Sequence, residues 1–378
     1  MRTVHISANP IATLDSTVER DYLISDWRHK ITANIGFDTA SFNLIASKTE
    51  LEEMFFEGCG RQIIRYTPDG HSIIWDGYIT EMVLNEPGLQ TRISLDEMAN
   101  SIIIRYVPTD TTTNPPTYST ETWTAAVNNT SSQGKYGIKQ KVFLPPVNRL
   151  TNTDAIQFAN VILKHYRKPI RSGLITSGMS EPSLQIMCKG YMHTLDWYIY
   201  NQSVVSGADN ANTIISTIIT ATGQNYIASQ RLDTNTTQVQ KYFLNYDTSY
   251  DLVQLIANLG DSSYNRWLVY VLEDRILYYK AASTIVDYFR RVEDARQEIR
   301  DLSGRIIPYW EMRPNHWIRT ADTFPHALTP ANLQDDFQIM FVESVEWTEP
   351  DGLILNGSQG DNLPVIIARM AAKGDRML

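Results

Sequence analysis

Residues 61–107 read RQIIRYTPDGHSIIWDGYITEMVLNEPGLQTRISLDEMANSIIIRYV and decide the fold of this chain. Hydrophobic and polar side chains alternate here in four short runs, which is the pattern of β-strands. Pro68-Asp69-Gly70 and Asn85-Glu86-Pro87-Gly88 separate some of the runs. Both are turns by composition, because proline presets φ, Asp and Asn bond to the nearby backbone, and glycine accepts positive φ. The spacing predicts a β-meander that closes into a small barrel or sandwich.

The overall composition fits a β-rich protein of several domains. With 378 residues, the chain is long enough for two to four domains of ordinary size. Hydrophobic residues make up 43% of it and aromatic residues 10%, which favours full cores, β structure and broad interfaces. No run approaches the ~20 apolar residues of a membrane span, so we expect no membrane-spanning segment.

The charge of the chain argues against a nucleic-acid-binding surface. The net charge is −9 and the isoelectric point is about 5.3, whereas contacts to phosphates need clustered lysines and arginines. The two small basic clusters, residues 164–168 and Arg290-Arg291, fit a helix C-terminus or a solvated face.

Cysteine usage favours folding in a reducing cytoplasm. Cys59 and Cys188 are the two cysteines, which is too few for a disulfide framework or a zinc site. The N-terminal residues contain no apolar run of signal-peptide length.

Outside the meander, the sequence predicts a mixture of strands and helices. We expect two strands within residues 24–42, a hairpin over 266–280 and a strand over 338–348. A strand over 184–191 is expected to continue through 193–200, and the charged residues 286–300 are expected to be solvated. Helices are predicted at 49–55, with a Thr49 cap, and at 153–166 and 247–259. Residues 212–221 fit a helix or a strand, and the following Gly223 favours the helix.

Two further segments leave alternatives open. Residues 109–133 are rich in Thr, Asn, Ser and Pro, so they form either a mobile linker or a contact surface. Pro350-Asp351-Gly352 repeats the tripeptide of Pro68-Asp69-Gly70. The repeat hints at two related barrels, one in each half of the chain.

No motif points to catalysis, a cofactor or a metal. The seven histidines include no pair with the i, i+4 spacing of a helical metal site, and no phosphate-binding or nucleophile motif is present. His193 and Asp196 lie close in sequence, but a dyad needs a nucleophile and a pocket. We therefore predict no catalytic, cofactor-binding or metal-binding residues, no cofactor, and no enzyme activity.

Carbohydrate chemistry is the alternative that these residue types leave open. Carboxylates are adjacent at Glu52-Glu53, Asp96-Glu97 and Asp335-Asp336, although a glycosidase pair must face across a cleft. Asp96-Glu97 is better explained as a cap for the segment after Leu95. Six tryptophans can stack on sugars but are better explained as core residues: Trp75, Trp197, Trp267, Trp310, Trp317 and Trp347.

In the order of its segments the chain resembles the baseplate or tail hub proteins of tailed bacteriophages. Three segments carry most of the resemblance: Trp75-Asp76-Gly77-Tyr78-Ile79, Leu95-Asp96-Glu97-Met98-Ala99-Asn100 and Cys188-Lys189-Gly190-Tyr191. The Thr/Pro-rich insertion, the 153–166 helix, the hairpin with Asp274-Arg275 and the closing strand, residues 341–347, follow in the matching order. The pieces together cover most of the chain, although each is short.

The resemblance implies a structural virion protein with an α+β, mostly β fold. Such hubs contribute two tube-like β-barrel domains per subunit and form a homotrimeric ring of pseudo-sixfold symmetry. The ring joins a hexameric tail tube, or a distal tail protein, to a threefold tip or spike. The tape measure protein is a further possible partner, and genome DNA passes through the lumen without specific binding. The implied location is the tail tip or baseplate of a virion assembled in the host cytoplasm.

On this resemblance the chain divides into five segments. Residues 1–108 form the first tube-like barrel, and 109–170 the Thr/Pro-rich insertion with its helix. Residues 171–205 complete or join a barrel. Residues 206–285 form an α+β middle domain, and 286–378 contribute to the second barrel. No fibre or lysin extension follows, so we expect any activity on the host wall to belong to another chain.

Two other functions remain compatible with the sequence. One is a glycan-binding or glycan-cleaving tail protein, which needs exposed tryptophans beside paired carboxylates. The other is a different tail adaptor such as a distal tail protein. The symmetry of the ring, threefold or sixfold, separates the adaptor from a hub.

Overall fold

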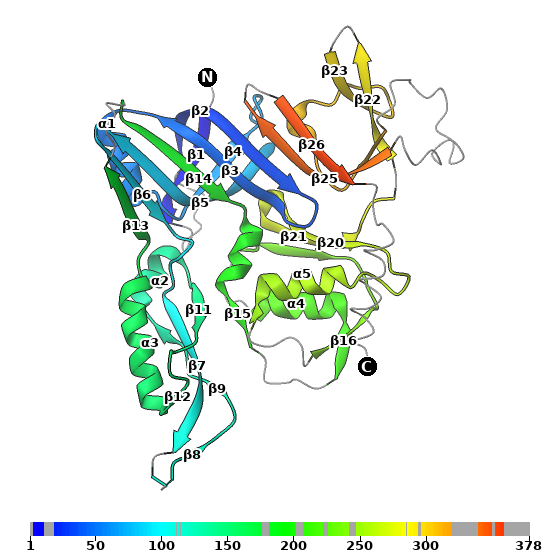
Figure 1. The fold of residues 1–378 in the computed structure, drawn as a ribbon. Helices are drawn as coiled ribbons and strands as arrows, with labels where there is room; N and C mark the ends of the chain where they lie inside the picture. The colour runs from blue at the N-terminus through cyan, green and yellow to red at the C-terminus, as the bar shows by residue number, and fades with distance from the viewer. Residues whose placement is uncertain are drawn as a thin grey trace.

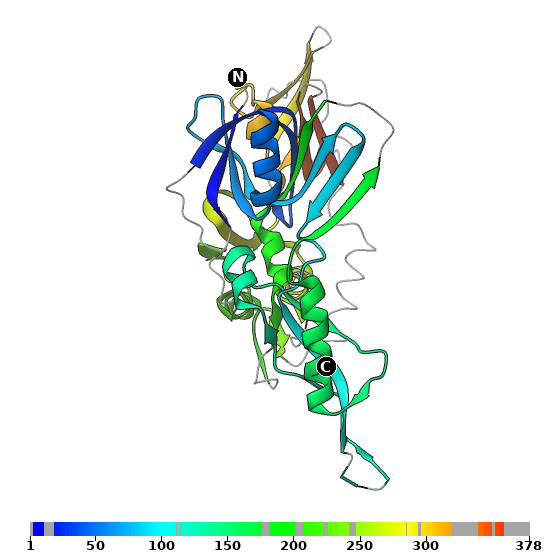
Figure 2. The same ribbon diagram turned by 90° about the vertical axis from the view of Figure 1, so that its left-hand side faces the viewer.

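The molecule is elongated, with a β-barrel at one end and a narrow arm at the other (Figures 1 and 2). The computed structural model describes residues 3–10, 19–110, 112–113, 115–175, 181–201, 207–221, 226–241, 247–284, 286–293, 296–319, 339–349 and 352–358. The predicted α+β, mostly β class is confirmed.

Six antiparallel strands close into the barrel. In barrel order they are β1 (Thr3–Pro10), β2 (Glu19–Thr32), β3 (Gly36–Ile45), β14 (Ser183–Lys189), β5 (Ile73–Glu86) and β4 (Arg61–Tyr66). Each strand pairs with the next, and β4 pairs with β1 to complete the circuit. Closure satisfies the backbone donors and acceptors that an open sheet leaves at its edges.

Aromatic side chains fill the barrel. Trp27, Phe37, Phe42 and Trp75 are at most 1% exposed. The Trp27 ring lies 5.6 Å from Phe42 and 6.3 Å from Trp75, measured between centroids. Such ring pairs add to the free energy gained by removing large apolar surfaces from water.

Helix α1 (Lys48–Glu57) covers one opening of the barrel. The sequence predicted Thr49 as its cap, but Ser47 holds that position and forms a capping box with Glu50. Leu51, Met54 and Phe55 are buried against the barrel strands, so the helix closes the core where the strands end.

The predicted meander is correct for its first three strands only. β4, β5 and β6 (Leu89–Ser94) pair in sequence. The fourth, β7 (Ser101–Asp110), leaves this sheet and forms the centre of a second one. Residues 95–100 turn the chain, and the backbone N–H of Ala99 donates to the carbonyl of Tyr166 in the arm rather than to β6.

The second sheet and two helices make the arm. Its short strands all pair with β7: β8 (Thr117–Tyr118), β9 (Thr122–Trp123), β10 (Val127–Asn128), β11 (Gln140–Phe143) and β12 (Arg149–Leu150). Helix α3 (Asn152–Tyr166) packs on this sheet as predicted, and α2 (Thr130–Tyr136) lies near the barrel. The Thr/Pro-rich segment is therefore held along β7 at three places.

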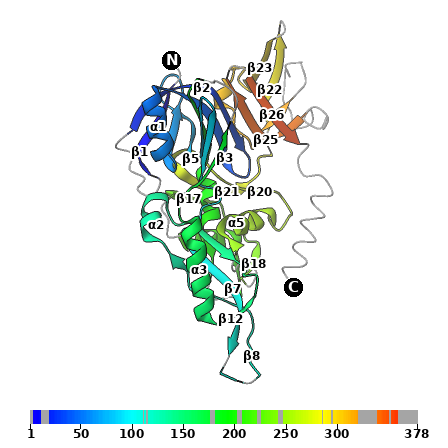
Figure 3. The same ribbon diagram turned by 60° about the vertical axis from the view of Figure 1, so that its left-hand side comes forward.

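An α+β domain packs beneath the barrel (Figure 3). It contains the predicted helices α4 (Ala211–Ala221) and α5 (Ser249–Asn258) and the predicted hairpin β20 (Trp267–Val271) and β21 (Ile276–Ala281). β17 (Ser229–Leu232) extends the hairpin, and two small pairs flank the helices: β15 (Ile199–Tyr200) with β19 (Asp247–Thr248), and β16 (Ala208–Asn210) with β18 (Gln238–Gln240). The predicted strand continuation over 193–200 is wrong for most of its length, because Tyr191–Trp197 is a 3₁₀ helix (η2) packed against α5.

Two glycines let this domain approach the barrel backbone. Gly36 has φ +83°, and a Cβ there would lie 1.9 Å from the carbonyl oxygen of Val271. A Cβ on Gly190 would lie 1.8 Å from the carbonyl oxygen of Phe37. The Val271 N–H donates to the Ile35 carbonyl at 3.0 Å, so the two bodies meet backbone to backbone.

The C-terminal strands extend the barrel sheet instead of standing apart. The predicted closing strand is β25 (Ile339–Thr348), which pairs with β2, β24 (Trp317–Arg319) and β26 (Gly352–Ser358). Two short 3₁₀ helices, Glu273–Arg275 and Tyr309–Glu311, lie in the connections. Residues 286–300, expected to be solvated, are largely a hairpin of β22 (Val286–Glu293) and β23 (Arg296–Asp301). A second closed barrel stays a prediction, and Pro350 and Asp351 of the matching turn lie outside the described residues.

Candidate assembly surface

One antiparallel sheet crosses the whole upper part of the molecule. Its order is β13 (Ile170–Ile175), β6, β5, β14, β3, β2, β25 and β26. Four of the eight strands belong to the barrel wall, and two more flank it on each side. In Figure 1 the sheet runs from β13 on the left to β26 on the right.

One face of this sheet is mostly polar along its length, with apolar side chains at its two edge strands. Cross-strand registers align Glu346, Lys30, Thr39 and Lys189 in one row. A second row aligns Asn43, Gln185, Val83, Arg92 and Ser172. The opposite face of the four wall strands forms the barrel core. The sheet therefore presents a broad, hydrated wall backed by a rigid apolar layer.

Charges on the polar face are largely paired with each other. Lys30 lies 3.7 Å from Glu346, Lys189 lies 2.8 Å from Asp96, and Arg92 pairs with Glu81. A hollow of about 540 Å³ lies on this face between the wall and the β25–β26 pair. The face can lie beside a polyanion without the clustered, unpaired cations that would hold it.

Both ends of the sheet are open in the part of the chain that the structure describes. β13 pairs there with β6 alone, and β26 with β25 alone. All six residues of β13 are exposed, including Leu174 at 61% and Ile175 at 87%. In β26, Ile354 is 55% exposed. Exposed apolar edge strands are templates for pairing with another chain.

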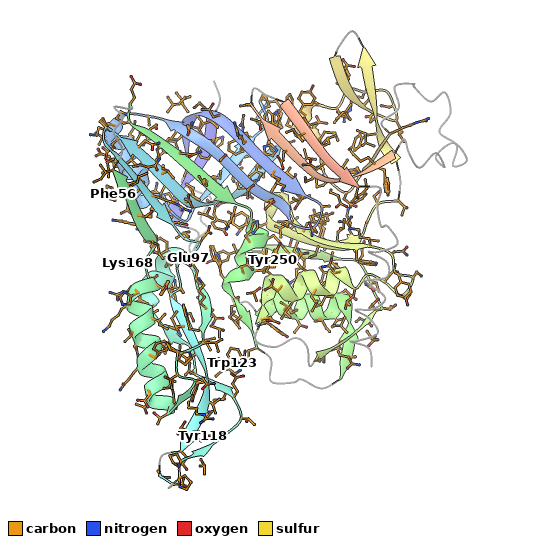
Figure 4. The ribbon with its side chains drawn as sticks, in the orientation of Figure 1. Phe56, Glu97, Tyr118, Trp123, Lys168 and Tyr250 are labelled. Atoms are coloured by element: carbon orange, nitrogen blue, oxygen red, sulfur yellow. The ribbon has the colours of Figure 1, made fainter. Side chains whose placement is uncertain are left out.

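The β13 end carries an additional apolar side chain. Phe56, at the end of α1, is 51% exposed and lies beside β13, where the Arg171 guanidinium stands 5.4 Å from its ring centroid. Figure 4 labels Phe56 at this end of the molecule. An exposed aromatic beside an open strand edge is typical of an interface rather than of a solvated surface.

A buried lysine fixes the arm to the barrel. Lys139 is 4% exposed; its Nζ donates to the carbonyl oxygen of Leu95 at 3.3 Å and lies 3.7 Å from the Trp197 ring centroid. Burial lowers the pKa of Lys139 to about 7, and the nearby Asp96 carboxylate opposes this shift. The adjacent Asn100 is fully buried, accepts from the Lys139 N–H at 2.8 Å and donates to the Gly137 carbonyl at 2.7 Å.

The barrel interior contains one buried imidazole. The Trp27 indole N–H donates to His29 Nδ1 at 2.9 Å. Burial, and then the charges of Arg313 and Arg65, lower the pKa of His29 to about 3. The histidine is therefore neutral at physiological pH and acts as a structural acceptor within the core.

His193 and Asp196, which lie close in the sequence, do not pair with each other in the described structure. His193 pairs with Asp38 at 2.9 Å rather than with Asp196, whose carboxylate accepts from the Thr248 hydroxyl at 3.4 Å. Burial raises the pKa of Asp196. His193, Asp196 and Lys139 line a hollow of about 490 Å³ where the arm, the barrel and the start of α5 meet. The Thr248 hydroxyl donates to Asp196 and not to the His193 imidazole, so the described contacts do not form a nucleophile–histidine pair.

The adjacent carboxylates serve the fold. Asp96 pairs with Lys189 of β14, and Glu97 lies 3.4 Å from Lys141 of β11, so this turn ties the barrel to the arm. Figure 4 labels Glu97 at that junction. Glu52 lies 3.5 Å from Lys48, one turn earlier in α1. Asp335-Asp336 lies outside the described residues.

Four of the six tryptophans singled out in the sequence are buried, whereas Trp310 is partly exposed and lines a hollow of about 550 Å³ together with Trp347 and Glu349. Trp75, Trp197, Trp267 and Trp347 are at most 8% exposed. Trp317 is partly buried, and its indole N–H donates to the Ser283 carbonyl at 2.7 Å. Their positions agree with the sequence-based interpretation of core residues.

Metal and membrane features are also missing from the described residues. No group of three or more His, Cys, Asp or Glu side chains there has the geometry of a metal site. No helix of the described chain has the length and apolar character to cross a membrane. Cys59 and Cys188 are free and buried, and burial raises the pKa of Cys59 to about 12.

Comparison with known proteins gives structural likeness alone. No protein-family model matches the sequence, and no curated protein matches it. A 43 kDa tail protein of prophage MuSo2 from Shewanella oneidensis is 8% identical with a TM-score of 0.42, over 95% of this chain and 97% of that one.

Two other solved structures are similar to the same degree. A tail protein from Neisseria meningitidis MC58 is 8% identical, with a TM-score of 0.41 over 93% of each chain. Prophage tail protein gp18 from Listeria monocytogenes EGD-e is 7% identical, with a TM-score of 0.39 over 98% of each chain. With TM-scores below 0.5, these likenesses do not decide the function.

The sequence-based interpretation placed residues 171–205 and 341–355 in β segments but did not predict that β13 and β26 form the edges of one sheet. β13 was not predicted as a separate strand, although IRSGLI has an apolar residue at each end and follows a proline that ends the preceding helix. The polar face was also missed. It is visible only after the registers of eight strands, distant in sequence, are aligned.

Proposed function

We propose that this protein is a structural component of a bacteriophage tail, and that it forms the hub ring of the tail tip or baseplate. The observation that carries the proposal is the eight-stranded sheet with one mostly polar face and, among the described residues, an unpaired strand edge at each end. A sheet of this kind lacks the closure that a single barrel has, and identical neighbours can supply it. The order of segments in the sequence resembles that of tail hub proteins, which supports the same assignment.

The proposed assembly is a homotrimer around a central lumen. Its partners are the tail tube or a distal tail protein on one side and a tip or spike protein on the other, with the tape measure protein as a further candidate. The polar sheet face is proposed to line the lumen. Its paired charges allow DNA to pass without specific binding, because attraction to phosphates requires clustered cations.

The protein is proposed to act without catalysis. Virion location and assembly in the host cytoplasm follow from the hub role, and the free buried cysteines are compatible with a reducing compartment. The buried tryptophans disfavour the glycan-binding alternative for the described part of the chain.

Electron microscopy of the full chain, alone and with tail extracts, tests the proposal. We expect threefold rings with an open lumen. Sixfold rings would favour a distal tail adaptor instead. A protein that remains monomeric under all these conditions would contradict the hub assignment, and cleavage of host-wall glycan would favour the enzymatic alternative.

A further inference from the structure

The two open edges of the sheet have matching directions. Every neighbouring pair along the path from β13 to β26 is antiparallel. Because the path contains an even number of strands, β13 and β26 run in opposite directions. Placing the β13 edge of one copy against the β26 edge of the next therefore continues the antiparallel alternation without a break.

The two edges also match in length and in the face they present. β13 has six residues and β26 has seven. Ser172 and Leu174 of β13 share the polar face through their pairing with Arg92 and Gln90. Ile354 shares the same face through its pairing with Glu346. Side chains alternate with period two, so one register keeps the polar face continuous across the junction.

The two edges differ in charge. Residues 167–175 read RKPIRSGLI, with three cations and no acid. β26 carries no charged side chain, and the carboxylates beside it are paired within the chain: Glu343 with Arg266, Glu346 with Lys30 and Glu349 with Arg65. A β13–β13 contact would bring like charges together, which disfavours it relative to a β13–β26 contact.

We infer that β13 of one copy pairs with β26 of the next copy, so that neighbouring sheets join edge to edge into a single continuous barrel. This is a heterologous contact, which closes into a ring when the rotation between copies allows it. The inference rests on the proposed hub function and adds the strands that make the ring contact. Phe56 beside β13 and Leu353 and Leu355 of β26 flank the junction on the side opposite the polar face.

The geometry gives a lumen of suitable size. With strands about 4.8 Å apart and tilted by about 40°, three such sheets close at a diameter of roughly 50 Å between backbones. Side chains on the polar face narrow this opening and leave a channel wider than a DNA duplex. One copy alone has too few strands to enclose such a channel.

Cysteine pairs in the full-length chain test the contact directly. Ser172→Cys and Asn356→Cys combined in one chain should form covalent dimers and trimers on oxidation, since opposed Cβ atoms lie about 4.5–5.5 Å apart. A second pair, Ser172→Cys with Ile354→Cys, samples the register shifted by two residues. Each single variant should stay uncrosslinked. The native cysteines are buried and do not compete.

The matched control places one cysteine in the middle of the same face. Gln185→Cys with Asn356→Cys should give at least about tenfold less crosslinked trimer, because β14 is already paired on both sides. A dimer formed by Ser172→Cys alone would indicate β13–β13 pairing and overturn the inference.

A charge substitution separates this contact from the proposed function itself. Leu174→Glu, which places an unpaired charge in the contact with the uncharged β26 of the neighbour, should weaken ring formation more than Leu174→Ala. If rings form but both cysteine pairs fail and Leu174→Glu has no effect, the edge contact is wrong and the hub function stands. If no ring forms with any tail component, the hub function fails as well.

Discussion

The barrel and the arm are built from consecutive strands of one meander, yet they are stabilised in different ways. β4, β5 and β6 stay in the barrel sheet, where Trp75 and its neighbours bury large apolar surfaces. β7 leaves, and its first residues are held by Asn100 and Lys139, two polar side chains that are almost completely buried. Apolar burial is non-directional, whereas hydrogen bonds fix orientation. Apolar burial in the barrel therefore provides stability, and the hydrogen bonds where the arm meets the barrel fix the orientation of the arm.

The largest effect is expected in the barrel core. Trp75→Ala should destabilise the protein by about 3–5 kcal/mol, because it removes a fully buried ring and leaves a cavity. Urea denaturation followed by fluorescence measures the change.

Trp75→Phe is the matched control for this substitution. The buried indole N–H of Trp75 has no hydrogen-bond partner among the described residues, so losing it removes a desolvation cost. The loss should be clearly smaller than for Trp75→Ala. Equal losses of stability in Trp75→Phe and Trp75→Ala would contradict the explanation that the volume of the buried ring determines the effect.

The next largest loss of stability is expected where the arm meets the barrel. Asn100→Leu should cost about 1–3 kcal/mol, because it leaves the N–H of Lys139 and the carbonyl of Gly137 without their partners. The arm should open before the barrel does.

Hydrogen exchange measured segment by segment distinguishes the two regions. Faster exchange in β7 and α3, with unchanged protection in β5 and β14, supports a local joint. A uniform increase over both regions would show that the barrel depends on the joint as well.

The pH dependence of the free energy of unfolding tests the role of the buried lysine between the arm and the barrel. Lys139 has a pKa of about 7 in the folded protein and an ordinary value of 10.5 when unfolded. Between these values the unfolded chain binds more protons, so this group's contribution to stability rises with pH. The slope is at most about 1.4 kcal/mol per pH unit.

Thermal unfolding from pH 7 to pH 9 measures this contribution. In Lys139→Met the rise should be absent, whereas Lys141→Met, an exposed neighbour on β11, should retain it. A rise of equal size in Lys139→Met would assign the effect to other groups.

The smallest effect on stability is expected at the sheet edge. Ile175→Lys should change the free energy of unfolding by less than about 0.5 kcal/mol, because the side chain is 87% exposed. Calorimetry measures it. A loss comparable to that of Asn100→Leu would mean that β13 supports the fold of the single chain.

The sequence predicted the local elements well and their partners less well. Helices α3, α4 and α5 and the β20–β21 hairpin follow from periodicity and caps within each segment. The departure of β7 from the meander does not, because it depends on Asn100 contacting Lys139 and Gly137, nearly forty residues away. The polar face could not be predicted, because it depends on the register between β2 and β25, which lie more than three hundred residues apart in the sequence.

Burial on both faces of β5 was a second source of error. Trp75 and Ile79 face the barrel core, whereas Tyr78 packs into the core of the α4–α5 domain. An alternating pattern predicts one face toward water, but the α4–α5 domain covers the part of that face around Tyr78. Which domain covers the second face cannot be inferred from β5 itself.

Gly36 and Gly190 give the molecule a mechanical property. Where the α4–α5 domain meets the barrel, part of the contact is made by backbone atoms that a single methyl group would force apart. Side chains can change rotamer under load, whereas peptide groups joined by hydrogen bonds cannot yield without breaking them. A force applied to the α4–α5 domain should therefore be transmitted to the barrel wall with little displacement of one part relative to the other.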